Sequence, residues 1–313
     1  MSDAMPASIS AMPPQCVDLA SDDDGATWHV TWAAAGETGY TEKPEAVAVQ
    51  GEMRVLYRDS AIIVVDKPAF FPTENTRTIR DSVRSRVEAL LRSDGDCRDQ
   101  GCTEPPPVHI PHRLDWETSG LLVVALGSAS MRSLSQQFAS RSVHKVYVAD
   151  VLGAPPASCG MIDLPLAPDP DRRPRQRVDF RAGKAARTNW QVERTAHAIS
   201  VVADPLGRPH ACRLRLAPES GRRHQLRMHC MALGCVIAGD GLYERSTCAG
   251  DTTPTRLHLH AAEITFVHPT EGRPITFVSQ PPFALERAAE RGMERNRIIE
   301  CSCASAAGAP YCV

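Results

Sequence analysis

Short apolar runs bounded by polar residues are the feature that most limits what this 313-residue chain can fold into. The runs at residues 61–65 (AIIVV) and 121–125 (LLVVA) have the length and the branched side chains of buried β-strands. Asp66, Lys67 and Pro68 end the first run at once. No run approaches the ~18 consecutive apolar residues that a membrane-spanning helix needs. We therefore expect a chain that buries a β-sheet and does not cross a membrane.

Two further segments, residues 143–151 and 212–216, alternate between apolar and polar side chains. This alternation is typical of half-buried strands, because successive side chains of a strand point to opposite faces. Residues 263–267 and 274–278 flank a short Thr-Glu-Gly-Arg sequence, and this arrangement predicts a β-hairpin.

Three segments, residues 79–91, 128–138 and 226–233, have apolar residues at helical spacing on one face. We expect Ser128 to cap the second helix and Gly234 to end the third. Strands and helices mix without a regular strand–helix–strand rhythm. The fold class predicted is therefore α+β and not a doubly wound parallel sheet.

Charge is distributed unevenly along the chain. Residues 1–50 carry eight acidic side chains and one lysine, whereas the rest of the chain is net basic. We predict that residues 1–50 form a flexible acidic extension, that residues 51–285 form one folded domain, and that residues 286–313 form a charged helix followed by a tail. Because the N-terminus lacks a basic start followed by an apolar run, we expect a cytoplasmic protein, with an organelle left open.

The eleven cysteines are odd in number and have no disulfide-scaffold spacing, so we expect reduced thiols. Four pairs of cysteines or histidines lie close in sequence. None has the Cys-x-x-Cys spacing of a structural zinc site or an evident third ligand, so we expect no metal. The pairs are Cys97 and Cys102, Cys301 and Cys303, His109 and His112, and His258 and His260.

A dense basic segment lies between residues 172 and 187. Arginine suits phosphate because its planar guanidinium donates two parallel hydrogen bonds. The density fits a nucleic-acid-binding surface, and it fits a solvated loop equally well. The basic side chains are those of Arg172, Arg173, Arg175, Arg177, Arg181, Lys184 and Arg187.

Asp115 stands directly before the apolar run 121–125, two residues after Arg113 and three before Thr118. A carboxylate at the mouth of a buried strand can act as a nucleophile or a base, and a nearby arginine favours its charged form. The alternative is an aspartate whose side chain only bonds the backbone near Thr118, which is a common turn device. The spacing alone leaves both open.

Two other positions are candidates for a site. Residues 222–227 (RRHQLR) place arginines at the start of a predicted helix, where backbone N–H groups attract anions. Tyr147 lies within the predicted strand at 143–151, where a tyrosine is more often a core residue than a catalyst.

Five blocks of sequence, taken in order, resemble the RluA-type pseudouridine synthases. The most specific is residues 110–125 (IPHRLDWETSGLLVVA). The resemblance implies a pseudouridine synthase fold with a mixed, mostly antiparallel sheet and flanking helices, and a catalytic domain at residues 51–285. The other blocks are VVDKP at 64–68, HKVY at 144–147, GRRHQLR at 221–227 followed by Gly239, Asp240 and Tyr243, and LHLHA at 257–261.

The resemblance implies isomerisation of uridine to pseudouridine in RNA, without a cofactor or a metal. Asp115 is then the essential carboxylate, and the resemblance leaves open whether it attacks the sugar or promotes a glycal intermediate. It further implies that Tyr147 stacks on the uracil and takes part in proton removal, and that Arg227 pairs with Asp115.

The same resemblance implies residues that bind the substrate. Leu226 would wall the pocket, and Arg113 would fill the stack that a flipped-out uridine leaves. Arg173 and Arg175, in the basic segment, would contact the RNA. RNA is the expected partner, and we expect the protein to act as a monomer.

One branch of the family fits best. Residues 162–166 (IDLPL), 173–175 (RPR) and 183–184 (GK) resemble the dual-specificity branch, whose members act on a tRNA anticodon loop and on a 23S rRNA hairpin loop. The sequence departs from the family where Phe70 and Phe71 stand in place of the usual glycine after the Lys-Pro pair. The loop at 93–109 is also longer than usual.

Two alternatives belong to other functional classes. An RNA-binding protein of this fold that has lost catalysis would not need Asp115, Tyr147 and Arg227, which are all present. A metal-dependent hydrolase would have to gather its ligands from the four histidines His109, His112, His258 and His260.

Overall fold

The computed structural model describes residues 52–93, 105–196, 211–243 and 256–285 of the chain. It also describes the backbone of two short paired strands, β1 (Asp18–Ser21) and β2 (Trp28–Thr31). The rest of the predicted extension at 1–50 and the predicted helix and tail at 286–313 lie outside the described residues, as does most of the loop at 93–109. Within the described residues, no helix is both long and apolar enough to span a membrane.

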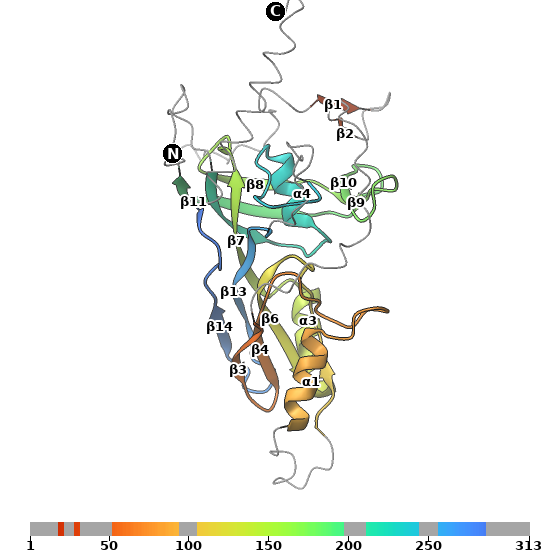
Figure 1. Cartoon of the computed structure of the whole chain (residues 1–313), viewed down its shortest axis with the longest axis vertical. Coiled ribbons are helices and arrows are strands. Elements are labelled where there is room, and N and C mark those ends of the chain that lie inside the picture. Colours follow the sequence, from red (N-terminus) through yellow and green to blue (C-terminus); the bar gives the residue numbers. More distant parts are fainter. Residues whose placement is uncertain are drawn as a thin grey trace, which may run out of the picture.

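One ten-stranded sheet is the framework of the described part of the molecule (Figure 1). Its strands pair antiparallel except for β6 and β13, which are parallel, so the predicted mixed, mostly antiparallel sheet and the α+β class are confirmed. The order is β3 (Arg54–Arg58), β4 (Ile62–Lys67), β6 (Ser119–Leu126), β13 (Leu259–Val267), β7 (His144–Leu152), β12 (Ala211–Pro218), β11 (Arg187–Ala196) and β8 (Cys159–Asp163), with β5 (Val108–His109) beside β6 and β14 (Pro274–Val278) beside β13.

The helices cover different parts of this sheet (Figure 1). Helices α1 (Val83–Ser93) and α3 (Gly127–Ala139) lie beside the end formed by β3, β4 and β6. Helix α4 (Gln225–Ala232) lies in the other half, beside the short hairpin of β9 (Leu166–Pro168) and β10 (Gln176–Val178). The predicted cap at Ser128 is wrong, because α3 begins at Gly127 and has no side-chain cap.

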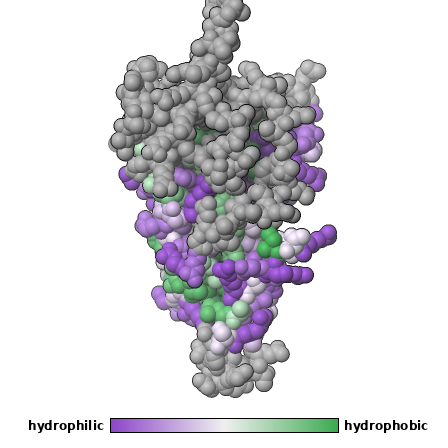
Figure 2. Space-filling model, in the orientation of Figure 1, coloured by the Kyte–Doolittle hydropathy of each residue, from purple (hydrophilic) through white to green (hydrophobic). Residues whose placement is uncertain are grey.

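The apolar run at residues 61–65 needs no polar alternation because β4 is covered on both faces. Ile63 packs in one buried cluster with Val87 of α1, while its neighbour Ile62 packs in another with Leu134 of α3. The side chains of Ile62 and Ile63 are fully buried. Figure 2 shows hydrophilic and hydrophobic residues interspersed on the visible face of this half of the molecule.

A separate buried cluster joins α4 to the central strands. Leu226 and Cys230 of α4 pack with Ala149 of β7 and Leu214 of β12. The predicted end of this helix is confirmed, because Gly234 follows it with a left-handed φ of 81° that glycine adopts without strain. The start of α4 is thereby held against β7 and β12.

The backbone at Phe70 adopts a conformation that suits glycine, the residue that is usual in the family that this sequence resembles. Its backbone is left-handed, with a φ of 57°, a conformation that costs a residue with a side chain about 1–2 kcal/mol and costs glycine almost nothing. The ring of Phe70 is nevertheless buried, with 5% exposure. Burial of the ring therefore offsets the backbone strain at a position suited to glycine.

We expect Phe70→Gly to be more stable than Phe70→Ala by about 1 kcal/mol, although both lose the buried ring. Alanine keeps the left-handed strain and glycine removes it. Urea unfolding of both variants measures the difference. Phe71 is the matched control, since it is equally buried and is absent from the left-handed residues, so there the alanine variant should be the more stable one. If the glycine variant were the more stable one at both positions, backbone strain at Phe70 would not be the cause.

Candidate active site

A cavity of about 170 Å³ opens where the turn before β6, strand β7 and the start of α4 meet. Its lining includes all three predicted catalytic residues, Asp115, Tyr147 and Arg227. Arg113 and Leu226, predicted to bind substrate, line it as well. Segments that are far apart in the sequence therefore bring five predicted site residues to one cavity.

The Asp115 turn depends on a close approach between β6 and β13. Gly120 pairs with Ala261 in the parallel part of the sheet and has a φ of 112°. A Cβ atom at position 120 would lie 2.4 Å from the carbonyl oxygen of Ala261, which is closer than atoms can pack. Glycine at this position lets β6 begin directly beneath the turn that carries Asp115.

The carboxylate of Asp115 is left without a partner by the turn. The turn is closed by the backbone N–H of Thr118, which donates to the backbone carbonyl of Asp115 (3.2 Å). Within the described residues, the side chain of Asp115 has no hydrogen bond or ion pair. The alternative in which this side chain only stabilises the turn is therefore wrong, and the carboxylate faces the cavity.

Lys67 fixes the backbone behind Asp115, a role that the sequence analysis missed. Its ammonium group is fully buried and donates to the carbonyls of Pro68 (2.9 Å), Phe71 (2.7 Å) and Trp116 (3.3 Å). Burial lowers the pKa of Lys67 to about 7, against the opposing attraction of Asp115. The end of β4 is thereby joined to the residue that follows Asp115.

Arg227 does not pair with Asp115, which corrects the expectation. Its guanidinium, 1% exposed, forms two hydrogen bonds with Asp240 (2.8 and 2.6 Å) and one with Glu117 (3.1 Å). Burial opposes its charge, but the attraction of Asp240 prevails and raises the pKa of Arg227. Among the described residues Asp115 acts on Arg227 only through longer-range attraction. Asp240 and Glu117 are site residues that the sequence analysis did not assign.

We expect Asp240→Asn to lower the free energy of unfolding by about 3–5 kcal/mol, because it leaves the Arg227 cation buried without its main partner. Glu117→Gln should cost only about 1 kcal/mol, since Glu117 makes one bond to Arg227 and its side chain is 21% exposed. Urea unfolding measures the free energy of unfolding of both variants. Equal decreases would show that Asp240 is not the dominant partner of Arg227.

Tyr147 extends from β7 into the cavity and is partly buried between two apolar clusters. Burial and then the charge of Asp115 raise the pKa of Tyr147. The side chain therefore carries its proton at neutral pH. It can supply an aromatic face and a hydroxyl donor, but not a resting tyrosinate.

A chain of hydrogen bonds holds the cavity wall at the start of α4. Gln225 accepts bonds from Ser220 (2.8 Å) and from the N–H of Arg222 (3.0 Å), and donates to Thr188 (3.0 Å). Thr188 in turn contacts Nδ1 of His229 (2.9 Å), whose Nε2 donates to a backbone carbonyl. Each of these polar side chains has a partner within the chain, and the linked bonds join the start of α4 to β11.

Buried histidines make the fold sensitive to acid. Burial lowers the pKa of His112 and His224 to about 3 and that of His229 and His260 to about 4. The unfolded chain binds these protons near pH 6.5 and the native chain does not. The stability that these four histidines contribute to the native state is therefore full above pH 6.5 and is lost as the pH falls from there towards 4.

We expect the free energy of unfolding to fall by about 1 kcal/mol from pH 8 to 7, because Lys67 takes up its proton near pH 7 in the native chain and at about pH 10.4 in the unfolded chain. Below pH 6.5 it should fall further, by up to about 1.4 kcal/mol per pH unit for each of these four histidines. Urea unfolding at half-unit intervals from pH 8 to 5 measures this slope. His229→Gln should show a shallower slope than the wild type. A stability that rises on acidification would contradict the assignment.

The basic hairpin lies beside the cavity but does not line it. Arg173 is exposed in the loop between β9 and β10, and Arg175 is half-buried with its guanidinium 5.1 Å from the ring centre of Tyr243. The Tyr243 hydroxyl accepts a bond from the backbone N–H of Gln176 (2.7 Å), and Arg227 lies 5.5 Å from the same ring. Tyr243 therefore joins the hairpin to the site arginine.

The four histidines of the metal-hydrolase alternative do not converge within the described residues. His112 accepts a backbone N–H bond from β6 (2.9 Å), while His109 lies in β5. His258 contacts the buried carboxylate of Asp150 (3.2 Å), and His260 bonds two buried serine hydroxyls. The nitrogens of His112, His258 and His260 therefore serve contacts within the protein, and the buried Nε2 of His109 has no hydrogen-bond partner among the described residues.

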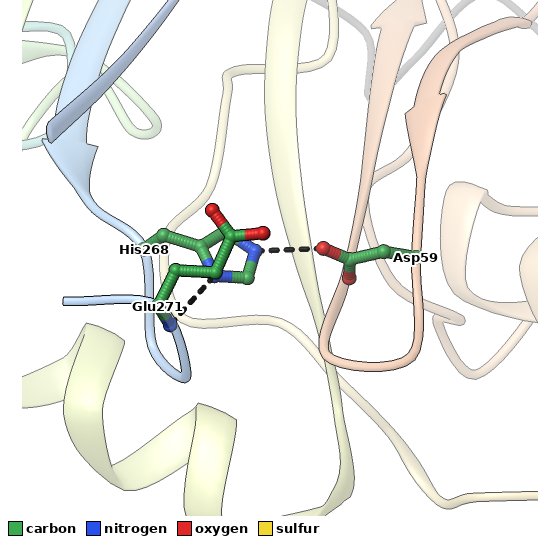
Figure 3. Close-up of side chains that lie close together, drawn as sticks. All are labelled: Asp59, His268 and Glu271. Carbon is green, nitrogen blue, oxygen red and sulfur yellow. Dashed lines mark hydrogen bonds and ion pairs between the residues drawn. The ribbon is translucent and has the colours of Figure 1, made fainter. Parts of the chain in front are cut away.

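Asp59, His268 and Glu271 are the one cluster of possible metal ligands within the described residues (Figure 3). The backbone N–H of Glu271 donates to Nδ1 of His268 (3.3 Å), which places the ring proton on Nε2. The Nε2 atom lies 2.7 Å from Oδ2 of Asp59. The arrangement is a histidine–aspartate contact between two loops and leaves no free nitrogen lone pair for a metal.

Comparison with known proteins matches residues 61–232 to the family described as RNA pseudouridylate synthase. The chain belongs to this family. The dual-specificity RNA pseudouridine synthase RluA of Yersinia pestis is 37% identical over 233 residues, which cover 74% of this chain and 100% of the relative. The protein of the same name from Escherichia coli K12 is 38% identical over 231 residues, covering 73% and 93%. The solved structure of human RNA pseudouridylate synthase domain containing 1 is 25% identical, with a TM-score of 0.58, and covers 79% of this chain and 90% of that one.

Membership of this family establishes the reaction class. The chain is an RNA pseudouridine synthase, an isomerase that converts uridine to pseudouridine. The family resemblance and the fold that it implied are confirmed. The metal-dependent hydrolase is excluded by this membership together with the placement of the histidines.

Proposed function

We propose that this synthase modifies a uridine in the anticodon loop of tRNA and a uridine in an rRNA hairpin loop, with Asp115 as its essential carboxylate. The dual specificity printed in the names of its relatives supports two RNA targets. The observation that carries the assignment of Asp115 is its carboxylate, unpaired within the described residues, in the cavity. RNA loops suit such a site because their bases flip out at a small energetic cost.

The carboxylate of Asp115 is available to the substrate because Arg227 bonds to Asp240 and Glu117 instead. The reaction breaks the bond between N1 of uracil and C1′ of ribose and forms a bond from C5 to C1′, with a proton leaving C5 and one arriving at N1. A carboxylate facing the sugar can stabilise or attack the electron-poor C1′ that forms when the first bond breaks. Asp240 and Glu117 hold Arg227 in place, so its positive charge lies near the site without quenching Asp115.

Tyr147 enters this reaction as a neutral phenol. Its ring offers a stacking face for the rotating uracil, and its hydroxyl donates a hydrogen bond to a uracil oxygen or nitrogen. Leu226, 7% exposed, supplies an apolar wall that keeps water from the detached base.

The remaining predicted substrate residues act at the rim. Arg113 is exposed at the mouth of the cavity, where its guanidinium can occupy the stack that the flipped uridine leaves. Arg173 and Arg175 lie on the hairpin beside α4, and we expect them to contact RNA phosphates. A monomer suffices for this arrangement, since one chain supplies every residue that we assign.

We expect Asp115→Asn to abolish pseudouridine formation while RNA binding changes by no more than a few fold. The substitution removes the charge needed for chemistry, whereas affinity comes mainly from phosphate contacts. Tritium release from tRNA labelled at C5 of uridine measures turnover, and filter binding measures affinity. Asp81→Asn, at an exposed acid before α1, is the matched control and should keep full activity. Residual turnover above a few per cent of the wild type would refute the role of Asp115.

A further inference from the structure

Phe180 is an aromatic side chain displayed to solvent. It is 49% exposed, and it is the only aromatic ring among the large exposed hydrophobic residues of the described chain. It lies in the loop that connects β10 to β11. Single exposed apolar side chains are common on protein surfaces, so the case for binding depends on what surrounds this ring.

The loop around Phe180 is rigid. The carboxylate of Asp179, 3% exposed, accepts bonds from the backbone N–H groups of Arg181 (3.0 Å) and Ala182 (2.8 Å) and from the side chain of Arg177 (3.1 Å). A Cβ atom on Gly183 would lie 2.1 Å from the carbonyl oxygen of Asp179, so the turn admits only glycine there. These contacts hold the ring of Phe180 outward and limit the entropy that it would lose on binding.

The side chains around Phe180 are mostly basic, which favours a negatively charged partner. Residues 172–187 carry seven basic side chains and one acid, Asp179, which is buried and bonded. Arg181 and Lys184 are exposed on the same loop as the ring. An aromatic face within a positive surface is the combination that binds unpaired nucleotides, because the ring stacks on the base and the cations attract its phosphates.

The loop is joined to the wall of the cavity. Arg222, which lines the cavity, donates from Nε to the carbonyl of Ala185 (3.1 Å). Leu166 and Lys184 exchange two backbone hydrogen bonds (3.0 and 2.8 Å), and Leu166 packs in one cluster with Met228 of α4. An RNA loop whose uridine occupies the cavity therefore has this segment beside it.

We propose that Phe180 is a stacking platform for an unpaired base of the RNA loop other than the target uridine. The proposal rests on the proposed RNA target. Arg181 and Lys184 attract the flanking phosphates, and the ring accepts the base without reading its identity. Such a platform suits an enzyme with two different RNA loops, since every base has a face that can stack.

The test compares side chains of different character at position 180 on a stem–loop RNA with a seven-nucleotide loop that contains uridine. Phe180→Ala and Phe180→Leu should raise Kd and KM roughly 5- to 100-fold and leave kcat at saturating RNA unchanged. Phe180→Trp should stay near the wild type. Because the ring is exposed, all variants should keep the wild-type melting temperature. Equal affinity of the leucine variant and the wild type would overturn the proposal.

A scan with abasic nucleotides identifies the stacked base. Removing that base should weaken binding to the wild type, and removing it should have no further effect on Phe180→Ala. Lys184→Ala should instead flatten the slope of log K against log salt by roughly 0.7, whereas Phe180→Ala leaves the slope unchanged. An abasic position that affects both proteins equally contradicts stacking. If the wild-type protein binds the stem–loop but forms no pseudouridine in it, the proposed target is refuted. The abasic scan then still decides whether Phe180 stacks on a base of that RNA.

Discussion

The arrangement of the site depends on one buried guanidinium. Arg227 is held by Asp240 and Glu117 and packs on the ring of Tyr243, so α4, the turn before β6 and the basic hairpin all converge on it. A buried cation is tolerated only when its partners are close and well aligned, which makes this geometry strongly coupled. If any one of these segments shifted, the buried charge of Arg227 would lose a partner. This cost favours a single arrangement of the residues around the cavity.

A second consequence concerns the placement of charge. With Arg227 neutralised by its own partners, Asp115 remains an acceptor with no competing donor among the described residues. Lys67 is near enough to attract Asp115, but its three hydrogens are used by backbone carbonyls. Lys67 and Arg227, two basic groups near the carboxylate that we propose as essential, thus have their hydrogen bonds committed to other acceptors. This arrangement allows the carboxylate to respond to charge that develops on the substrate.

Local signals in the sequence predicted local structure well. The apolar run at 61–65, the hairpin at 263–278 and the end of α4 at Gly234 were all readable, because strand and helix periodicity and turn chemistry act between near neighbours. Helix α3 has the predicted inner face but not the predicted cap. The partners of Arg227 were missed, since Asp240 is 13 residues away and Glu117 is 110 residues away, and only the folded sheet brings them together. Five of the seven residues that the resemblance named line the cavity, but it paired Arg227 with the wrong acid.

The exposed arginines that lie outside the cavity also affect how the enzyme would release its product. Uridine and pseudouridine have the same atoms and the same phosphates, so a site that held the nucleotide by strong contacts in the cavity would hold both. In the function that we propose, exposed arginines outside the cavity, such as Arg173, attract the RNA phosphates. Dissociation is then governed by contacts that salt and solvent reach freely.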